Sequence, residues 1–119
     1  MNSRSLPIRS ETCINCHWSE EECHKAIKKL YKKGSLPQAF VVSSDLMAMA
    51  VLKALYDYGV KVPEQVAVMG ITNIEMARFS NPPLSTVNVP MAEMGALALD
   101  ILKERMEWRF RSAWTVLLQ

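Results

Sequence analysis

Residues 38–69 decide the fold and have the sequence QAFVVSSDLMAMAVLKALYDYGVKVPEQVAVM. Two short apolar runs, at residues 38–43 and 65–69, stand at the two ends of this stretch. Continuous apolar runs of this length are typical of strands that are buried on both faces, as in parallel sheets. Between them, Asp45 is expected to cap a helix that ends at Gly59. The strand, helix, strand order predicts two parallel strands joined by a crossover helix.

The same alternation continues toward the N-terminus. Ser19 is followed by three glutamates, which predicts a capping box in which Ser19 accepts a bond from the Glu22 amide and Glu22 reaches back. The helix that begins there has one apolar stripe and should end near Lys33, because Gly34 favours the left-handed stop. Residues 11–15, ahead of this helix, are predicted to form a further strand.

Toward the C-terminus, the pattern predicts a short turn or helix at residues 74–79, a strand at residues 84–88 and a last helix that begins at Pro90. Residues 114–118 have the composition of a strand but no following partner. The whole order predicts an α/β chain with a three-layer, mainly parallel sheet and helices on both faces. The core stripe of the last helix is expected to comprise Met94, Leu97, Ala98, Ile101 and Leu102.

Composition excludes several classes of protein. The 119 residues are 50% hydrophobic and 22% charged, which is typical of one globular domain. A net charge of +2 is too small to indicate a nucleic-acid partner, and a lysine-rich run at residues 24–33 is interpreted as a solvated helix face, with a nucleic-acid surface as the alternative. No apolar run approaches a bilayer span or a signal core, and three cysteines, an odd count, agree with a reducing compartment. We therefore expect a cytoplasmic protein without a membrane partner.

Polar and aromatic side chains follow each predicted strand. Ligands bind beyond the carboxyl ends of the strands in open parallel sheets, where these residues should gather. An indole face packs on the C–H face of a sugar, and hydroxyl and amide groups exchange hydrogen bonds with its hydroxyls, so a neutral polyhydroxy ligand is expected. The alternatives are that Trp18 packs on Cys23, and that the polar groups satisfy only turn amides. The positions are His17, Trp18, Ser44, Asp45, Thr72, Asn73 and residues 88–91.

No pattern for catalysis appears in the sequence. Neither a Ser/His/Asp order, nor paired carboxylates, nor a glycine-rich phosphate loop is present, so we expect no catalytic residue and no enzyme activity. Residues 13–17, CINCH, match the pattern for covalent haem attachment, and Cys23 with His24 suggests zinc. Both are discounted because the first pattern falls on a predicted strand, where neighbouring side chains point to opposite faces. We expect no metal and no cofactor.

Four motifs in order resemble the C-terminal half of LacI/GalR transcriptional regulators. They are AFVVSSDLMAMA at residues 39–50, GVKVPEQVAVMG at residues 59–70, NPPLSTV at residues 81–87, and Gly95. The third motif is the most specific. The resemblance implies one lobe of a periplasmic-binding-protein-like effector domain, in a regulator that forms dimers or tetramers and clamps a sugar or nucleoside between two lobes.

The resemblance also implies a domain organisation. Residues 1–119 would be the C-terminal lobe of a sugar-sensing domain, with the DNA-binding headpiece and the N-terminal lobe absent, so that operator DNA is bound only through that headpiece. The function implied is effector sensing and dimerisation in a LacI-type regulator. The alternative is a lobe of a transport-associated periplasmic sugar-binding protein, which the Pro-Pro-Leu-Ser-Thr-Val segment disfavours.

Carried over residue by residue, the resemblance makes Trp18 the aromatic that stacks on the ligand, Ser44 a polar contact and Met91 an apolar wall. Asn73 joins them from its place at a strand end. The sequence departs from the family at Ser44, where an asparagine is usual, and at Thr72, where a carboxylate is usual. A lost charge-assisted bond is worth roughly 1.5 to 3 kcal/mol, so the effector is expected to be unusual or weakly held.

The helix that begins at Asp45 has a second apolar face, and two apolar faces imply two partners. The resemblance places this face and the segment after the third strand at a two-fold dimer axis. The alternative is that this face meets another lobe or loops of the same chain. The interface candidates are Leu46, Met47, Ala50 and Phe79.

Overall fold

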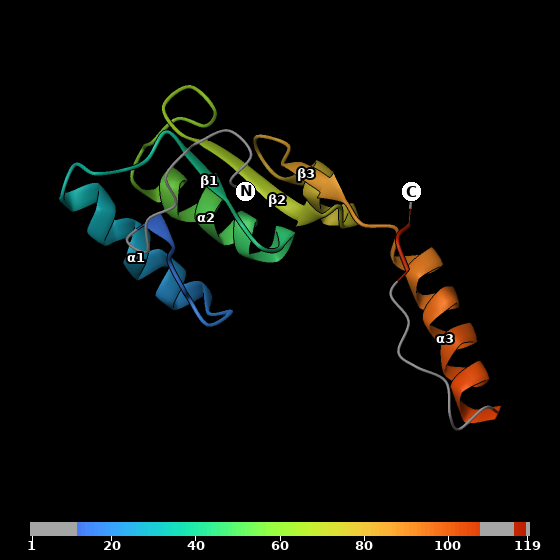
Figure 1. Cartoon of the computed structure of the whole chain (residues 1–119). Coiled ribbons are helices and arrows are strands. Elements are labelled where there is room, and N and C mark those ends of the chain that lie inside the picture. Colours follow the sequence, from blue (N-terminus) through green and yellow to red (C-terminus); the bar gives the residue numbers. More distant parts are fainter. Residues whose placement is uncertain (1–11, 108–115, 119) are drawn as a thin grey trace, which may run out of the picture. The chain divides into compact units, whose positions relative to one another are not determined.

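The structure, a computed structural model, describes residues 12–107 and 116–118 and divides into two compact units, Met1–Asn88 and Val89–Gln119. Within the described residues, the first unit carries helices α1 and α2, three strands and the short 3-10 helix η2, and the second carries helix α3 (Figure 1). In chain order the elements are α1 (Glu20–Lys32), β1 (Ala39–Val41), α2 (Asp45–Asp57), β2 (Ala67–Thr72), η2 (Glu75–Phe79), β3 (Ser85–Asn88) and α3 (Met91–Glu107).

The three strands form one parallel sheet in the order β1-β2-β3. Val41 of β1 lies opposite Met69, and Thr72 of β2 lies opposite Asn88. The predicted α/β class and parallel sheet are confirmed. Because all three strands run the same way, their carboxyl ends lie at one edge of the sheet.

Strand boundaries differ from the sequence-based expectation. The run at residues 38–43 contributes only the three residues of β1, whereas β2 begins two residues later than expected and continues through Gly70 to Thr72. The strand expected at residues 11–15 is wrong for residues 12–15, which belong to no strand. There the Asn15 side-chain oxygen accepts a bond from the His17 amide at 3.0 Å, a local bond that competes with strand pairing.

The predicted strand at residues 114–118 falls partly outside the described residues. Of its positions, 114 and 115 are not described, and residues 116–118 carry no regular secondary structure. The short helix predicted at residues 74–79 is confirmed as η2, and the strand predicted at residues 84–88 is confirmed as β3, one residue shorter.

Half of the capping box at the start of α1 is confirmed. The Ser19 hydroxyl accepts a hydrogen bond from the Glu22 amide at 3.3 Å. Glu22 does not reach back, because the Ser19 amide donates instead to the Cys16 carbonyl at 2.8 Å and the Glu22 carboxylate pairs with His17 Nδ1 at 2.8 Å. The helix thereby fixes the turn that precedes it.

The cap of α2 corrects another expectation. Ser44, and not Asp45, is the N-cap, since its hydroxyl accepts a hydrogen bond from the Met47 amide at 3.3 Å. Asp45 is the first residue of the helix, and its side chain is buried, with 1% exposed. A buried carboxyl group needs hydrogen-bond partners, which are described below.

Helix α2 lies at the centre of the first unit (Figure 1). It packs against β2 and against α1. Burial of its apolar faces supplies most of the core. The buried hydrophobic residues are Cys23, Ile27, Met47, Ala48, Val51, Leu52, Ala54, Leu55, Val66, Val68, Ala77 and Leu84.

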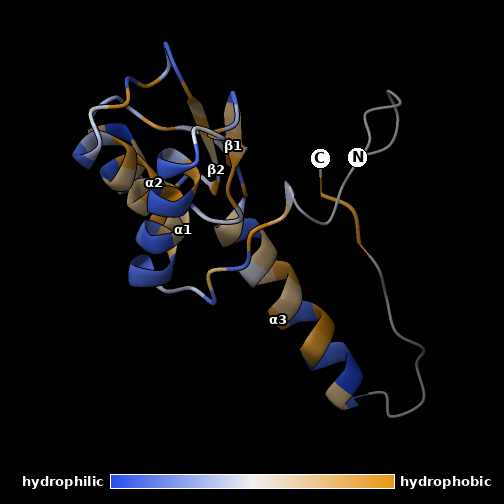
Figure 2. Cartoon of the chain, turned by 90° about the vertical axis from the view of Figure 1, so that its left-hand side faces the viewer, coloured by the Kyte–Doolittle hydropathy of each residue, from blue (hydrophilic) through white to orange (hydrophobic). Residues whose placement is uncertain are grey.

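Helix α3, in the second unit, has hydrophobic and hydrophilic residues along its length (Figure 2). The helix itself is confirmed, but the core stripe expected on it is not, because none of its residues is buried. An apolar stripe is buried only where a second surface covers it, and the described residues of this unit supply none. No helix within residues 12–107 is both long and apolar enough to cross a membrane.

Candidate ligand-binding site

The buried Asp45 carboxyl group joins three segments at the carboxyl edge of the sheet. Its Oδ2 accepts a hydrogen bond from the Ile74 amide at 2.8 Å, and its Oδ1 accepts one from the Thr86 hydroxyl at 2.5 Å. The start of α2 is therefore tied to the loop after β2 and to β3. Sequence reasoning placed Asp45 at this edge but assigned it a capping role, because the two partners are 29 and 41 residues away in the chain.

Gly70 provides the space that the Asp45 carboxyl group occupies. A Cβ atom on Gly70 would overlap Asp45 Oδ1 and would lie 3.1 Å from Leu84 Cδ2. Only a residue without a side chain fits there. The glycine that ends the 59–70 motif and the aspartate of the preceding motif are thus parts of one packing arrangement.

Asn73 is held at the same edge by two hydrogen bonds to β3. Its backbone amide donates to Thr86 Oγ1 at 3.2 Å, and its side-chain Nδ2 donates to Asn88 Oδ1 at 3.0 Å. Ser44, Thr72 and Asn73 therefore lie on loops that Asp45 and Thr86 connect. Asn88, which the sequence placed after the fourth strand, belongs to the same group.

Four non-glycine residues of the described chain have a positive φ angle, and all four are at predicted ligand positions. The angles are +48° and +60° at His17 and Trp18, and +132° and +60° at Thr72 and Asn73. Such backbone conformations cost about 1 to 3 kcal/mol each and concentrate at functional sites. Thr72 is the most unusual of the four because a β-branched residue rarely adopts a positive φ angle.

Trp18 lies on a rigid turn with its side chain in solvent. The turn is fixed by the hydrogen bonds that the His17 amide donates to Asn15 Oδ1 and the Ser19 amide donates to the Cys16 carbonyl, together with the pair of His17 and Glu22. The Trp18 side chain is 73% exposed, so the alternative in which it packs on Cys23 is wrong. A large exposed aromatic ring held by a strained turn is available to a ligand.

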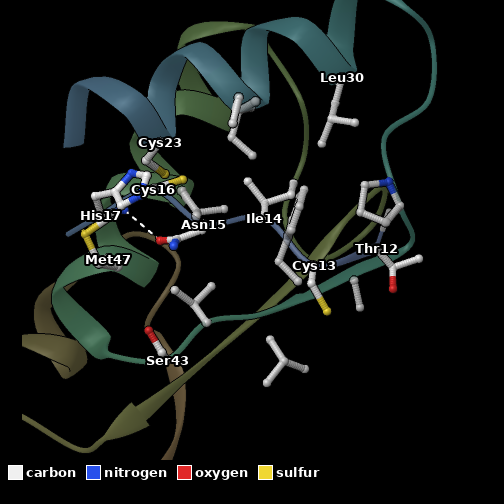
Figure 3. Close-up of a pocket in the computed structure, with 18 of the residues that line it drawn as sticks. Thr12, Cys13, Ile14, Asn15, Cys16, His17, Cys23, Leu30, Ser43 and Met47 are labelled. Atoms are coloured by element: carbon white, nitrogen blue, oxygen red, sulfur yellow. Dashed lines mark hydrogen bonds between the residues drawn. The ribbon is translucent and has the colours of Figure 1, made fainter. Parts of the chain in front are cut away.

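A cavity of about 750 Å³ lies between residues 12–18, α1 and β1 (Figure 3). Its lining includes Trp18 and Ser43, the residue before Ser44. Ser44, Thr72 and Asn73 are not among its lining residues. Two groups of predicted ligand residues are therefore present, Trp18 at the cavity and the trio at the strand ends. Met91 belongs to the second unit, where its side chain is 53% exposed.

The predicted dimer residues divide into two groups. Leu46 and Phe79 are 64% and 70% exposed, as a contact surface requires. The prediction that Met47 lies at the surface is wrong, because it is part of the core and only 8% exposed. Ala50 is partly buried against the same core. Met76 of η2, 59% exposed, was missed by sequence reasoning, which treated residues 74–79 only as a connection.

The CINCH segment is not a strand, so the geometric reason for discounting haem attachment does not hold. The Cys13 side chain nevertheless points away from Cys16 (Figure 3). Among the residues that the structure describes, no group of three or more His, Cys, Asp or Glu side chains could hold a metal ion. The lysines of α1 are exposed, as a solvated face requires, and Lys25 pairs with Glu21 at 2.6 Å.

Residues 5–118 match the family described as the periplasmic binding protein-like domain. Among curated proteins, the chain is 39% identical over 92 residues to the HTH-type transcriptional repressor MelR of Bacillus subtilis, which covers 77% of this chain and 27% of the repressor. It is 41% identical over 81 residues to the ribose operon repressor of Escherichia coli, covering 68% of this chain and 24% of that protein. The chain therefore spans about a quarter of the length of these two relatives.

Solved structures agree with these sequence relatives. A LacI family transcriptional regulator from Lactobacillus casei with bound sucrose superposes with a TM-score of 0.74 at 28% identity, over 95% of this chain and 42% of that one. A sugar-binding regulator of the LacI family from Escherichia coli superposes with a TM-score of 0.67 at 35% identity, over 75% of this chain and 32% of that one. This chain belongs to the periplasmic binding protein-like domain family, in the form found in LacI-type transcriptional regulators.

Proposed function

We propose that the chain is the C-terminal lobe of the effector-sensing domain of a LacI-type transcriptional regulator, and that its effector is a sugar or a related small molecule. Two relatives support this assignment, since the LacI-type structure from Lactobacillus casei holds sucrose and the regulator CelR is solved as a complex with cellobiose, at 28% and 29% identity to this chain. The curated relatives are transcriptional repressors rather than transport proteins or enzymes.

The observation that carries the proposal is the location of the strained backbone. The positive φ angles at His17 and Trp18, and again at Thr72 and Asn73, fall in the two loops whose side chains would contact a ligand. Hydrogen bonds hold both turns, and the turn at Trp18 leaves that residue 73% exposed instead of burying it. A binding site gives a reason for such strain, because it needs its contacts fixed before the ligand arrives.

Each side chain has a chemical role in this proposal. Trp18 supplies an exposed aromatic face for the sugar ring. The Ser44 hydroxyl already accepts a bond from the Met47 amide, so its proton remains for donation to the ligand. Thr72 and Asn73 supply neutral hydroxyl and amide groups. None of the side chains proposed to contact the ligand is a carboxylate, which suits a neutral ligand held by several modest hydrogen bonds.

Assembly and location follow from the same assignment. We propose a homodimer or tetramer in which Leu46, Ala50 and Phe79 contact the second copy, with Met76 added to the surface. In this proposal operator DNA is bound by a separate headpiece of the regulator, and the regulator acts in the cytoplasm, where its DNA target lies. The exposure of Leu46, Met76 and Phe79, at 59% to 70%, supports the interface.

Titration of the isotope-labelled chain with mono- and disaccharides tests the proposal by nuclear magnetic resonance. We expect the Trp18 indole resonance and the Asn73 amide resonances to shift together, and Trp18→Ala to abolish the response. Tyr56→Ala is the matched control, because Tyr56 is an equally exposed aromatic residue, at 75%, on α2. Shifts confined to residues away from both loops, or no shift at any sugar, would refute the assignment.

A further inference from the structure

Three cysteines, Cys13, Cys16 and Cys23, line the cavity beside Trp18, and the effector-sensing proposal uses none of them. Cys23 lies in the first turns of α1 with 3% of its surface exposed, and Cys16 is half-buried and packs against the core that contains Cys23. Burial, and after it the neighbouring Cys16, raise the pKa of the Cys23 thiol. Figure 3 shows these two side chains next to each other, with Cys13 directed elsewhere along the cavity.

We propose that Cys16 and Cys23 form a reversible dithiol pair that a hydroperoxide oxidises to a disulfide. The pair brackets the strained turn at His17 and Trp18, so the disulfide closes a covalent loop around Trp18. Proteins of reducing compartments use such transient disulfides as redox sensors rather than as structural bonds. Cys13 takes no part, because its side chain points away from both partners.

The two thiols have different roles in the reaction. Cys16 is the attacking thiol, since it is the more exposed of the pair and borders the open cavity. Its thiolate attacks one oxygen of hydrogen peroxide, the O–O bond breaks, and the departing hydroxide takes up the proton that Cys16 released, which leaves water and a sulfenic acid. Cys23 is the resolving thiol, because burial and the neighbouring Cys16 raise the pKa of its thiol to about 11 and keep it protonated.

In the second step the Cys23 sulfur attacks the Cys16 sulfur. The S–S bond forms while the S–O bond breaks, and the departing hydroxide takes the Cys23 proton to give a second water. The net reaction oxidises two thiols to one disulfide and reduces one hydrogen peroxide to two waters. A dithiol reductant reverses it by thiol–disulfide exchange.

Backbone bonds around the pair already connect the two residues. The Ser19 amide donates to the Cys16 carbonyl at 2.8 Å, and the Cys23 amide donates to the Ser19 carbonyl at 3.0 Å. The disulfide would therefore close a loop that hydrogen bonds have largely formed. Formation of the bond is independent of the ligand, whereas its effect on sugar binding rests on the proposed function.

Mass spectrometry of the full chain tests the pair directly. The reduced chain is treated with hydrogen peroxide, free thiols are blocked with N-ethylmaleimide, and the protein is digested. We expect a peptide linking Cys16 to Cys23, with Cys13 blocked, and the same link in Cys13→Ser. Cys16→Ser should lose the link, and Cys23→Ser should retain a Cys16 sulfenic acid that dimedone traps. If Cys23→Ser does not fold, Cys16→Ser, at a half-buried position, alone decides whether the link is lost.

Three blocked cysteines, a Cys13–Cys16 link, or a link between two chains as the main product would overturn the proposal. A second measurement compares the Trp18 indole resonance in the reduced and oxidised chain without ligand. We expect it to shift on oxidation and to return with a dithiol reductant. A disulfide that leaves this resonance unchanged overturns the effect on the Trp18 turn. A sugar response that is absent in both redox forms refutes the effector proposal instead.

Discussion

The Thr86 hydroxyl donates a hydrogen bond of 2.5 Å to the buried carboxyl group of Asp45, which lies 41 residues earlier in the chain. The same Thr86 oxygen accepts a hydrogen bond from the Asn73 amide at 3.2 Å. Two motifs that resemble the LacI/GalR family, around Asp45 and around Thr86, are therefore in direct contact at the carboxyl edge of the sheet. This contact gives a structural reason for the residues that the two motifs contain, and changes at Asp45 and at Gly70 test it.

Asp45→Asn should destabilise the chain by about 1 to 3 kcal/mol, because the asparagine NH₂ group would face either the Ile74 amide or the Thr86 hydroxyl and leave a buried donor without an acceptor. Urea unfolding followed by circular dichroism measures the change. Asp57→Asn is the control, since exposed Asp57 bonds only to the surface groups of Lys53 and His24, and its effect should be much smaller. Equal effects of the two changes would contradict this account of Asp45.

Gly70→Ala should cost about 1 to 3 kcal/mol of stability, because the added methyl group overlaps Asp45 Oδ1 and displaces the carboxyl group. Gly95→Ala is a matched control, since a Cβ atom there meets nothing within 4 Å. Gly95→Ala should leave the stability of the chain unchanged or raise it by up to about 1 kcal/mol, because alanine favours a helix more than glycine does. Thermal unfolding of both variants distinguishes the two positions, and a neutral Gly70→Ala would show that the Asp45 packing is not restrictive.

Thr72→Asp should strengthen sugar binding by about 10- to 100-fold, because it adds a charge-assisted hydrogen bond worth roughly 1.5 to 3 kcal/mol. Thr72→Asn has the shape of aspartate without its charge and should leave affinity within a few-fold. Resonance titration provides the dissociation constants, and equal affinities for both variants would argue against a ligand contact at residue 72.

Leu46→Glu and Phe79→Glu should each dissociate a homodimer, because they place a charge on a surface that is proposed to be apolar. Sedimentation velocity measures the change in oligomeric state. Tyr56→Glu, at a similarly exposed hydrophobic position of α2, serves as the control and should leave the dimer intact. A dimer that survives both changes would remove Leu46 and Phe79 from the interface.

Stability should fall as the pH rises from about 9 to about 11, because the folded state holds the pKa of the Cys23 thiol at about 11 whereas an unfolded thiol titrates near 9. In this window the unfolded chain loses a proton that the folded chain retains, so ionisation favours unfolding. Urea unfolding at pH 8 and pH 10.5 measures the difference between the wild type and Cys23→Ala. An identical pH dependence in both proteins would show that Cys23 is not the source.

The sequence predicted most of the fold because its signals are local. Apolar runs, the Ser19 cap and the glycines after α1 and α2 each act within a few residues, and α1, α2 and the parallel strands were all found. The strand predicted at residues 11–15 is absent from residues 12–15, because the His17 amide donates a local hydrogen bond to the Asn15 side chain that overrides a weak strand pattern. The core stripe predicted on α3 is not confirmed, because no described residue of the second unit covers it.

The candidate site was harder to predict than the fold. The loops after β1, β2 and β3 were located, because the carboxyl ends of parallel strands meet at one edge, whereas the strand predicted ahead of Trp18 is absent. The role of Asp45 was missed, since its partners are distant in the chain, and Met47 was assigned to the wrong side of α2 because methionine suits a core as well as a contact surface. Strain at Thr72 has no sequence signal, because threonine is not a residue expected at a positive φ angle.

Ser44, Asp45 and Leu46 are consecutive residues that occupy three different environments. Ser44 is half-buried at the strand ends, Asp45 is 1% exposed within the core, and Leu46 is 64% exposed on the outer surface. Under the proposed function, the ligand contact at Ser44 and the interface contact at Leu46 are therefore only two residues apart, on either side of a carboxyl group anchored to Ile74 and Thr86. Effector and partner subunit would then have a route of communication along the main chain, without a relay of side chains.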